Sequence, residues 1–156
     1  MQNSKKKTLE YLREIRESFW GQIVWTNGCF DILHKGHKDY LEKARSLGNC
    51  LIVGLNSDGS VRKLKGAGRP VNDGYNRGKN LFSLRHVSYV VVFDELSPID
   101  YIRELKPDFY VKGGDYHLGT INQDERKLVE SYGGKIVIIP KVHKVSTSEI
   151  IEKMNS

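Results

Sequence analysis

A chain of 156 residues is long enough for one domain with its own hydrophobic core. No apolar run approaches the roughly 20 residues of a membrane-spanning helix, and the basic N-terminus (Lys5–Lys7) is not followed by the apolar segment of a secretory signal. The spacing of Cys29 and Cys50 suggests neither a disulfide framework nor a zinc site, so we expect reduced thiols in a cytoplasmic protein.

The net charge of +6 favours anionic partners. A basic surface can bind nucleic acid or small polyanionic substrates. The basic residues are scattered along the chain and do not alternate with aromatic residues, as they do on a face that binds single strands. We therefore predict a small anionic substrate, with no nucleic-acid and no membrane partner.

The pattern of apolar positions predicts the secondary structure. Residues 1–20 are expected to form an amphipathic helix with Leu9, Leu12 and Ile15 on its apolar face, ahead of a single domain over residues 21–156. Apolar and β-branched runs predict strands at about 22–26, 50–55, 89–93, 109–111 and 135–139. Helical spacing and capping residues predict helices at about 36–47, from 59, over 76–86, from 97 to before 106, over 123–132 and after 146.

Strands that alternate with helices build parallel βαβ units. The predicted fold class is therefore α/β, a Rossmann-like doubly wound parallel sheet of about five strands with helices on both faces. Within the helix over 76–86, Leu81, Phe82 and Leu84 are expected to face inward, and the segment 63–70 is too rich in glycine and charge to be regular. Ligands of such sheets bind beyond the carboxyl ends of the strands.

The segment from Thr26 to His37 carries the strongest functional signal. A strand runs into a glycine-containing turn, and the turn opens a helix whose first turn holds His34 and His37 with Gly36 between them. A helix start offers free N–H groups and the positive end of its dipole to an anion. Two imidazole donors beside a residue without a side chain would complete a cradle for a polyphosphate, which indicates nucleotide chemistry.

In this setting the His-x-Gly-His signature, preceded by Gly-x-Phe-Asp, resembles that of the nucleotidylyltransferase superfamily. This superfamily includes glycerol-phosphate cytidylyltransferases and heptose-phosphate adenylyltransferases. Residues 56–66, 69–72 and 111–116 are similar to segments of the D-glycero-D-manno-heptose 1-phosphate adenylyltransferases. The resemblance covers residues 20–153.

The resemblance implies that an oxygen of a sugar phosphate attacks the α-phosphorus of ATP in line, releasing pyrophosphate and forming ADP-heptose. His34 and His37 would donate hydrogen bonds to the phosphates, and Lys65 would close over them as a third catalytic residue. Mg²⁺ would bridge the triphosphate oxygens, so no protein metal site is expected. The implied nucleotide-binding residues are Thr26, Asn27, Gly28, Cys29, Phe30, Gly36, Asn56, Asp58, Arg69, Lys112, Gly113, Gly114, Asp115, Ser146, Thr147 and Ser148.

Several of these residues also have a structural explanation. Asp31 could cap the turn instead of contacting a substrate phosphate. Lys65 and Arg69 could be solvated loop charges, and residues 113–115 could form only a turn. Arg77 matches an arginine of the family but could equally be a surface residue of its helix.

Two segments depart from the heptose branch. Arg85 opens an Arg-His-Val-Ser segment closer to the cytidylyltransferases, which makes it a further candidate for substrate contact, and residues 73–76 replace an acidic stretch. One alternative is therefore a CTP-dependent cytidylyltransferase acting on glycerol 3-phosphate or another polyol or sugar phosphate. Another is a non-catalytic nucleotide- or nucleic-acid-binding module. Residues 146–148 can cap a helix as well as bind phosphate, and the family also suggests a homodimer.

Overall fold

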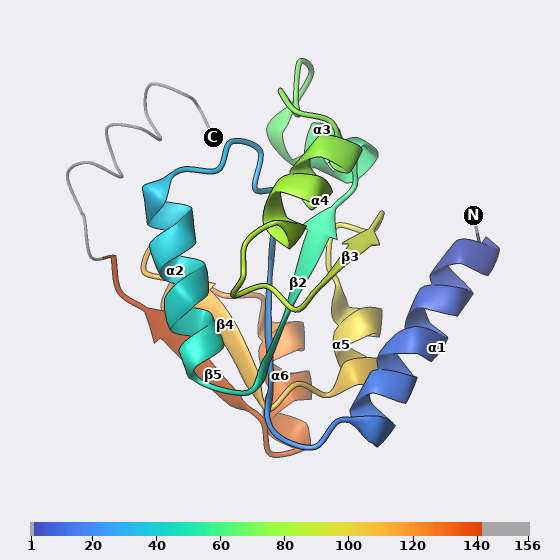
Figure 1. Ribbon diagram of the computed structural model, residues 1–156, viewed down its shortest axis with the longest axis vertical. Helices are drawn as coiled ribbons and strands as arrows, with labels where there is room; N and C mark the ends of the chain where they lie inside the picture. The colour runs from blue at the N-terminus through green and yellow to red at the C-terminus, as the bar shows by residue number, and fades with distance from the viewer. Residues whose placement is uncertain (1, 142–156) are drawn as a thin grey trace.

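Residues 2–141 are described by the computed structural model, in which five strands form one sheet (Figure 1). All neighbouring strands are parallel, in the order β3-β2-β1-β4-β5. The strands are β1 (Ile23–Gly28), β2 (Cys50–Asn56), β3 (Tyr89–Phe93), β4 (Phe109–Gly113) and β5 (Lys135–Ile139). The helices are α1 (Gln2–Ser18), α2 (Lys35–Ser46), α3 (Asp58–Lys65), α4 (Gly74–Phe82), α5 (Ile99–Leu105) and α6 (Gln123–Ser131). The predicted Rossmann-like α/β fold is confirmed.

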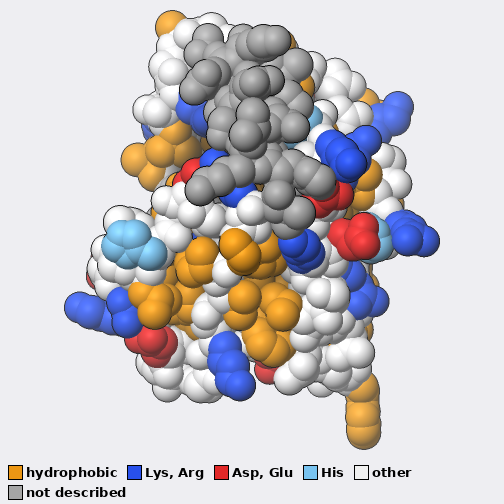
Figure 2. All heavy atoms as spheres, turned by 90° about the vertical axis from the view of Figure 1, so that its left-hand side faces the viewer, with side chains coloured by type: hydrophobic (Ala, Val, Ile, Leu, Met, Phe, Trp, Pro, Cys, Tyr) orange, Lys and Arg blue, Asp and Glu red, His pale blue; other side chains and the backbone are white. Residues whose placement is uncertain are grey.

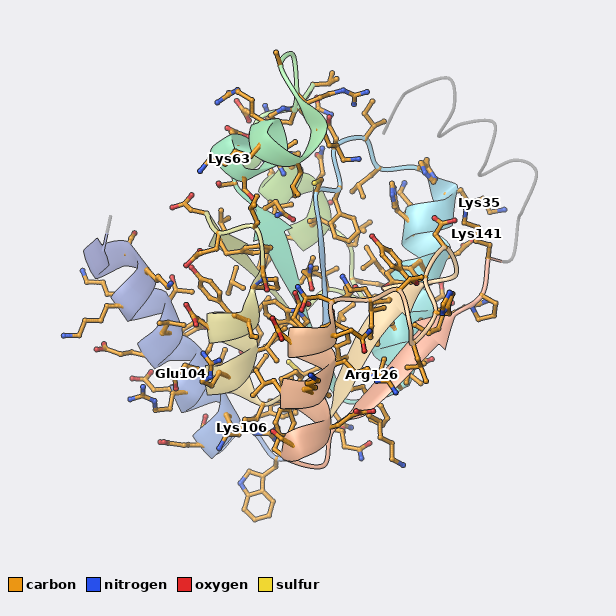
Figure 3. All side chains as sticks on the ribbon, turned by 180° about the vertical axis from the view of Figure 1, so that it is seen from behind. Lys35, Lys63, Glu104, Lys106, Arg126 and Lys141 are labelled. Carbon is orange, nitrogen blue, oxygen red and sulfur yellow. The ribbon has the colours of Figure 1, made fainter. Side chains whose placement is uncertain are left out.

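Each face of the sheet is covered by its own set of helices, because successive side chains of a strand point to opposite faces. Trp25 and Tyr110 pack in a buried cluster with residues of α1, α5 and α6. Val24 and Val111 pack in a second cluster with residues of α2 and α4. Figure 3, seen from behind, shows α1, α5 and α6 in front of the sheet. Residues one position apart on β1 or β4 therefore serve opposite sides of the molecule.

The first helix ends earlier than predicted, at Ser18, but its apolar face is the expected one. Leu12 is fully buried and Ile15 is 7% exposed. Near the start of the helix, Lys5 forms ion pairs with Glu95, which precedes α5, and with Asp100 in the first turn of α5. Apolar packing and ion pairs together fix α1 against α5, on the face of the sheet opposite α2.

The helix predicted over 76–86 is shorter and begins earlier. Its N-cap is Asp73, whose carboxylate accepts a hydrogen bond from the N–H of Asn76, and the helix ends at Phe82. The expected inward position of Phe82 is wrong, since its side chain is 62% exposed. Adjacent helical residues lie about 100° apart around the axis. With Leu81 fully buried, Phe82 therefore points away from the sheet.

Two smaller predictions also need correction. Residues 63–65 were expected to be irregular, yet they form the last turn of α3, whose N-cap is Ser57. The helix expected from residue 97 begins at Ile99, with Pro98 as its N-cap. The predicted helix after residue 146 lies outside the described residues.

Residues 2–141 cover the β5 edge of the sheet only in part. The central residues of β5, from Ile136 to Ile138, are half-buried. Figure 2 shows hydrophobic side chains gathered on the side of the molecule where α2 and β5 lie. No helix of the described chain is long and apolar enough to cross a membrane.

Candidate functional site

A cavity of about 700 Å³ lies at the carboxyl edge of the sheet, where the loops after the strands meet. Fifteen of the predicted site residues line it: Thr26, Asn27, Gly28, Cys29, Phe30, Asp31, His34, Gly36, His37, Asn56, Lys65, Lys112, Gly113, Gly114 and Asp115. The lining residues that the sequence reasoning did not assign to the site are Asp39, Tyr40, Lys43, Leu64, Leu96, Pro98, Tyr116, Asn122, Glu125, Ile139, Pro140 and Lys141. The expected position of the ligand beyond the strand ends is therefore matched by a cavity of suitable size for a nucleotide.

The turn after β1 has an unusual backbone that brings its residues over the cavity. Phe30 has a φ of 46°, a backbone conformation that residues other than glycine rarely adopt. Its ring packs edge-on against the imidazole of His37, with the ring centroids 5.6 Å apart. A Cβ atom on Gly28 would lie 3.1 Å from the Phe30 ring. Glycine at position 28 thus leaves room for the aromatic ring that supports His37.

His34 and His37 lie side by side at the start of α2, with their ring centroids 4.0 Å apart. His34 is the N-cap, and its Nδ1 accepts a hydrogen bond from the N–H of Gly36 at 3.0 Å. The Nδ1 of His37 accepts a weaker one from the N–H of His34 at 3.4 Å. Because both Nδ1 atoms accept, these bonds assign the ring proton of each neutral imidazole to Nε2.

The His34 Nε2 is buried and has no hydrogen-bond partner among the described residues. Burial lowers the pKa of both imidazoles, and the pKa of His37 falls to about 4 because the charge of a protonated His34 adds to the effect of burial. Both rings are therefore neutral donors at neutral pH. A buried N–H group without a protein partner is a position where a ligand oxygen can complete the hydrogen bond.

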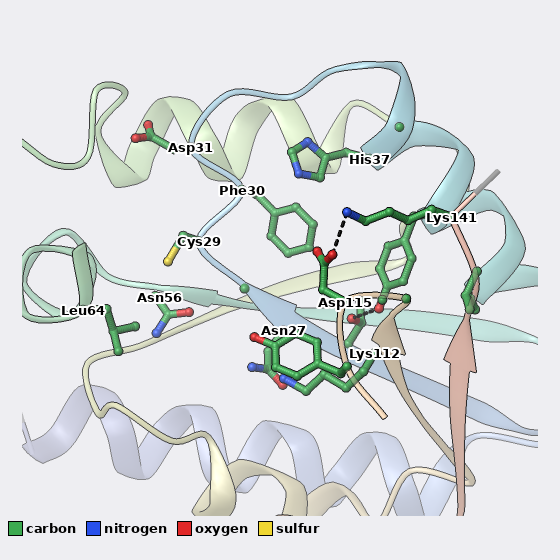
Figure 4. A pocket seen from close by; sticks show the side chains of 18 of the residues that line it. Asn27, Cys29, Phe30, Asp31, His37, Asn56, Leu64, Lys112, Asp115 and Lys141 are labelled. Atoms are coloured by element: carbon green, nitrogen blue, oxygen red, sulfur yellow. Dashed lines mark hydrogen bonds and ion pairs between the residues drawn. The ribbon is translucent and has the colours of Figure 1, made fainter. Parts of the chain in front are cut away.

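Lysines supply the positive charge around the cavity. Lys43 lies on α2, Lys65 is the exposed last residue of α3, and Lys141 follows β5. Lys141 forms an ion pair of 2.6 Å with Asp115 (Figure 4). A Cβ on Gly114 would lie 3.0 Å from the backbone nitrogen of Lys141. The glycine therefore allows the loops after β4 and β5 to approach each other closely.

Two polar residues line the cavity while their side chains bind protein groups. The hydroxyl of Thr26 donates to the carbonyl of Val111 at 3.0 Å and shares a 2.8 Å hydrogen bond with Tyr40. The amide of Asn56 donates to the hydroxyl of Ser60 at 3.0 Å. These side chains hold strand ends and helix starts in place at the cavity wall.

The Asp31 carboxylate fixes the loop that follows α3. It is 4% exposed and accepts hydrogen bonds from the N–H groups of Val71 at 2.8 Å and Asn72 at 2.9 Å, with Arg69 at 3.4 Å. Burial alone would raise the pKa of Asp31, but these donors outweigh it and the pKa is lowered. The carboxylate thus holds residues 71–72 against the turn after β1 and does not cap that turn itself. Asp31 lines the cavity, whereas Arg69 lies outside its lining.

Arg77 is fully buried beneath the turn after β1 and does not line the cavity. Its guanidinium donates to the carbonyl oxygens of Cys29 and Asn56, both at 2.8 Å, and of Asn72 at 3.0 Å. It also binds the carboxylate of Asp58 at 2.7 Å, so that Asp58 too faces the protein. Arg77 is neither a surface residue nor placed to touch a ligand, and it ties the cavity turn to β2 and α4.

Arg85 lies far from the cavity in the fold. It is exposed in the segment that precedes the amino end of β3, whereas the cavity lies at the carboxyl ends of the strands. In the same segment Ser88 binds the backbone of Leu51 through its N–H and its hydroxyl, at 2.9 Å and 3.1 Å. Ser88 therefore ties this segment to β2. Ser146, Thr147 and Ser148 lie outside the described residues.

Sequence reasoning missed a buried polar group on the side of the cavity opposite the two histidines. Glu125 is 4% exposed, and its carboxylate accepts hydrogen bonds from Tyr110 and, at 2.7 Å, from Ser97. Its position in the first turn of α6 resembles that of any acidic residue that favours a helix start. No local signal separates it from Asp124.

Comparison with known proteins places the chain in a family. Residues 25–153 match the family model described as cytidylyltransferase-like. The bifunctional protein HldE of Trichlorobacter lovleyi is 49% identical over 156 residues, which cover 97% of this chain and 31% of that protein. The HldE of Helicobacter hepaticus is 44% identical over 151 residues, which cover 97% of this chain and 30% of that protein. The chain thus spans less than a third of the length of these relatives.

Solved structures agree with this placement. A lipopolysaccharide core biosynthesis protein from Thermoplasma volcanium superposes with a TM-score of 0.64 at 26% identity, over 79% of this chain and 98% of that one. A pantoate-β-alanine ligase from Francisella tularensis superposes with a TM-score of 0.59 over 85% of this chain and 64% of that one. At 17% identity the ligase shows the shared fold alone. With most of its length matched by the family model, and with relatives nearly half identical, the chain belongs to the cytidylyltransferase-like family.

Proposed function

We propose that this domain transfers a nucleoside monophosphate from a nucleoside triphosphate to a sugar phosphate and releases pyrophosphate. The proposed substrates are ATP and D-glycero-D-manno-heptose 1-phosphate, and the product is ADP-heptose. The observation that carries the proposal is the pair His34 and His37, two neutral imidazoles at a helix start, one with a buried Nε2 that lacks a protein partner. The choice of substrates is supported by the heptose-branch segments and by the similarity to the HldE proteins.

The reaction requires positioning and charge stabilisation more than covalent chemistry by the protein. An oxygen of the sugar phosphate forms a bond to the α-phosphorus, while the bond from that phosphorus to the bridging oxygen of the β-phosphate breaks. Negative charge then grows on the phosphate oxygens. The Nε2–H groups of His34 and His37, with the free N–H groups of α2, would donate to these oxygens. Lys43 and Lys65 would add positive charge from the rim.

Mg²⁺ is proposed to enter the site together with the triphosphate, where it would neutralise part of the phosphate charge. Among residues 2–141, no three His, Cys, Asp or Glu side chains gather to hold a metal ion. The Asp31 carboxylate is occupied by backbone N–H groups. The triphosphate would supply most of the ligands of such an ion, and the protein would supply one or two at most.

Pyrophosphate release in the presence of Mg²⁺ tests the proposal directly. ATP and CTP are each combined with heptose 1-phosphate and with glycerol 3-phosphate. Turnover with ATP and the heptose phosphate alone is the expected result. Turnover restricted to CTP would instead establish a cytidylyltransferase, and no turnover in any combination would contradict the proposed reaction.

A histidine variant separates an enzyme from a binding module. His34→Ala combined with His37→Ala should abolish turnover while the melting temperature shows a folded protein. The matched control is His86→Ala, since His86 does not line the cavity, is partly exposed and contacts Glu42 at 3.5 Å. Loss of turnover in the control as well would indicate an effect unrelated to the proposed phosphate contacts.

Two further proposals concern the setting of the reaction. ATP and a sugar phosphate are metabolites of the cytoplasm, so we place the enzyme there. A homodimer stays a prediction, and sedimentation velocity of the purified chain would test it.

A further inference from the structure

Two residues on one side of the cavity, Glu125 and Lys112, are not used by the reaction proposed above, although the family resemblance implied that Lys112 binds the nucleotide. Glu125 lines the cavity although it is only 4% exposed. Tyr110 and Ser97 each donate a hydrogen bond to one of its oxygens, which fixes the carboxylate. Each carboxylate oxygen can accept a second hydrogen bond. Glu125 therefore presents oriented acceptors to a ligand.

Lys112 provides a cation next to this carboxylate. Its Nζ lies 5.6 Å from the ring centroid of Tyr110 and 5.4 Å from that of Tyr116. It forms no hydrogen bond or ion pair with any residue from 2 to 141 that the structure describes. Burial lowers the pKa of Lys112, while the charge of Glu125 opposes that effect. Aromatic faces hold the ammonium group without neutralising it. Its positive charge is therefore available to attract an anionic ligand.

Asn27 adds a donor at the same place. Its Oδ1 accepts a hydrogen bond from the indole of Trp25 at 3.0 Å, which directs the amide NH₂ elsewhere. Figure 4 shows Asn27 beside Lys112, on the opposite side of the cavity from His37. This part of the cavity thus combines a cation, an amide and a fixed carboxylate, as recognition of a phosphate with several hydroxyl groups requires.

The in-line geometry of the reaction assigns the Lys112–Glu125 side of the cavity to the acceptor. His34 and His37 belong to α2, which covers one face of the sheet, whereas Tyr110 and the α6 residue Glu125 belong to the other face. In phosphoryl-type transfer the attacking and leaving oxygens lie roughly in line on opposite sides of the phosphorus. If the leaving pyrophosphate is held by the histidines at α2, the attacking oxygen must approach from the side of α5 and α6.

We propose that Lys112 binds the phosphate of the acceptor and that Glu125 accepts hydrogen bonds from its sugar hydroxyl groups, forming a subsite for polyhydroxylated phosphates between β4 and the starts of α5 and α6. Tyr110 and Ser97 are positioning residues for Glu125. The inference rests on the proposed function, because it names the side on which the second substrate of that reaction binds. It also explains why a buried carboxylate faces a cavity whose other ligand is a polyanion.

The test compares Glu125→Gln and Lys112→Met with the wild type. Glutamine keeps the shape of the side chain but exchanges one acceptor for a donor, and methionine removes the charge of the lysine. The matched control is Glu130→Gln on the same helix, because Glu130 is exposed and contacts Arg126 at 3.5 Å. Melting temperatures show whether each variant is folded. Calorimetry measures the Kd of a non-hydrolysable ATP analogue, and initial rates give the KM for heptose 1-phosphate.

Each variant should raise the KM for the acceptor about 10- to 100-fold, the loss expected for a hydrogen bond to a charged group. The Kd of the ATP analogue should stay within about twofold of wild type, and the control should match wild type in both. A raised Kd for the ATP analogue with an unchanged KM for the acceptor would overturn the inference, since the two residues would then bind the nucleotide.

A wild type that turns over no sugar phosphate would count against the proposed function, and direct calorimetry of heptose 1-phosphate then decides the subsite. Binding to wild type that is lost in Lys112→Met would support the subsite on its own. Equal binding to both proteins, or none to wild type, would overturn it.

Discussion

Replacement of Arg77 by methionine should destabilise the turn that lines the cavity although Arg77 itself lies outside it. The guanidinium binds the carbonyl oxygens of Cys29, Asn56 and Asn72 at 2.8 to 3.0 Å. It also binds Asp58 at 2.7 Å. Methionine fills much of the volume but donates no hydrogen bond. Three backbone carbonyls from three different segments would lose their shared donor.

The size of the effect follows from burial. Removing one partner of a buried, hydrogen-bonded ion pair costs about 3–5 kcal/mol, mainly because the remaining polar groups lose their partners. The Asp58 side chain is 42% exposed, so water can replace its bond to Arg77, and most of the loss comes from the carbonyls. For a domain of this size, 1 kcal/mol corresponds to roughly 2–4 °C in Tm. The expected decrease in Tm is therefore about 6–20 °C.

Thermal denaturation followed by circular dichroism measures the decrease. Arg103→Met is the control. The Arg103 side chain is 55% exposed, and among the described acidic residues it forms an ion pair with Asp100 alone. An ion pair at the surface contributes little to the free energy of unfolding. Calorimetry with an ATP analogue should show weaker binding to Arg77→Met, since the Cys29 turn lines the cavity. A Tm within about 2 °C of wild type would refute the reasoning, because surface substitutions already cause changes of that size.

Three further predictions concern titration and charge. His34 and His37 should stay neutral as the pH falls through 6.5, because their pKa values are lowered, that of His37 to about 4; an NMR titration with midpoints near 6.5 would contradict this. Since the unfolded chain takes up these protons at higher pH, stability should decrease between pH 6.5 and about 4, as denaturant titrations across that range would measure. Asp31→Asn should cost about 1–3 kcal/mol at pH 7. Because the pKa of Asp31 is lowered, its contribution is present above the unfolded pKa and lost in acid, so urea titrations should show the difference from wild type shrinking there. Lys65→Ala should raise the KM for ATP about tenfold without lowering Tm, and an unchanged KM would remove Lys65 from the site.

The sheet and the gathering of most site residues could be predicted because both depend on local pattern. The run from Cys50 to Leu55 is apolar throughout, and every residue of β2 is buried on the two faces of the parallel sheet. Once the strands are known, the loops after them must meet at one edge. The segments Thr26–Phe30 and Lys112–Asp115, far apart in sequence, therefore line one cavity.

The environment of Arg77 could not be predicted, because its partners are distant in the chain. Its guanidinium binds carbonyls 48 residues away at Cys29 and 21 residues away at Asn56. Every residue has a backbone carbonyl, so the sequence does not show which carbonyls bind an arginine. A buried arginine and an exposed one in the same helix therefore look alike in sequence. Glu125 was missed for the same reason, since its donors Tyr110 and Ser97 belong to other elements.

The position of Arg85 changes the argument about the nucleotide. The sequence similarity of its segment to cytidylyltransferases favoured CTP only if Arg85 lies near the substrates. It precedes the amino end of β3, at the opposite edge of the sheet from the cavity. Its identity therefore carries no information about the base. Since a ligase of different chemistry shares the fold, the fold does not determine the substrates either. Base and acceptor must be distinguished by side chains within the cavity, where the histidines and the Lys112–Glu125 side offer two chemically different environments on opposite faces of one sheet.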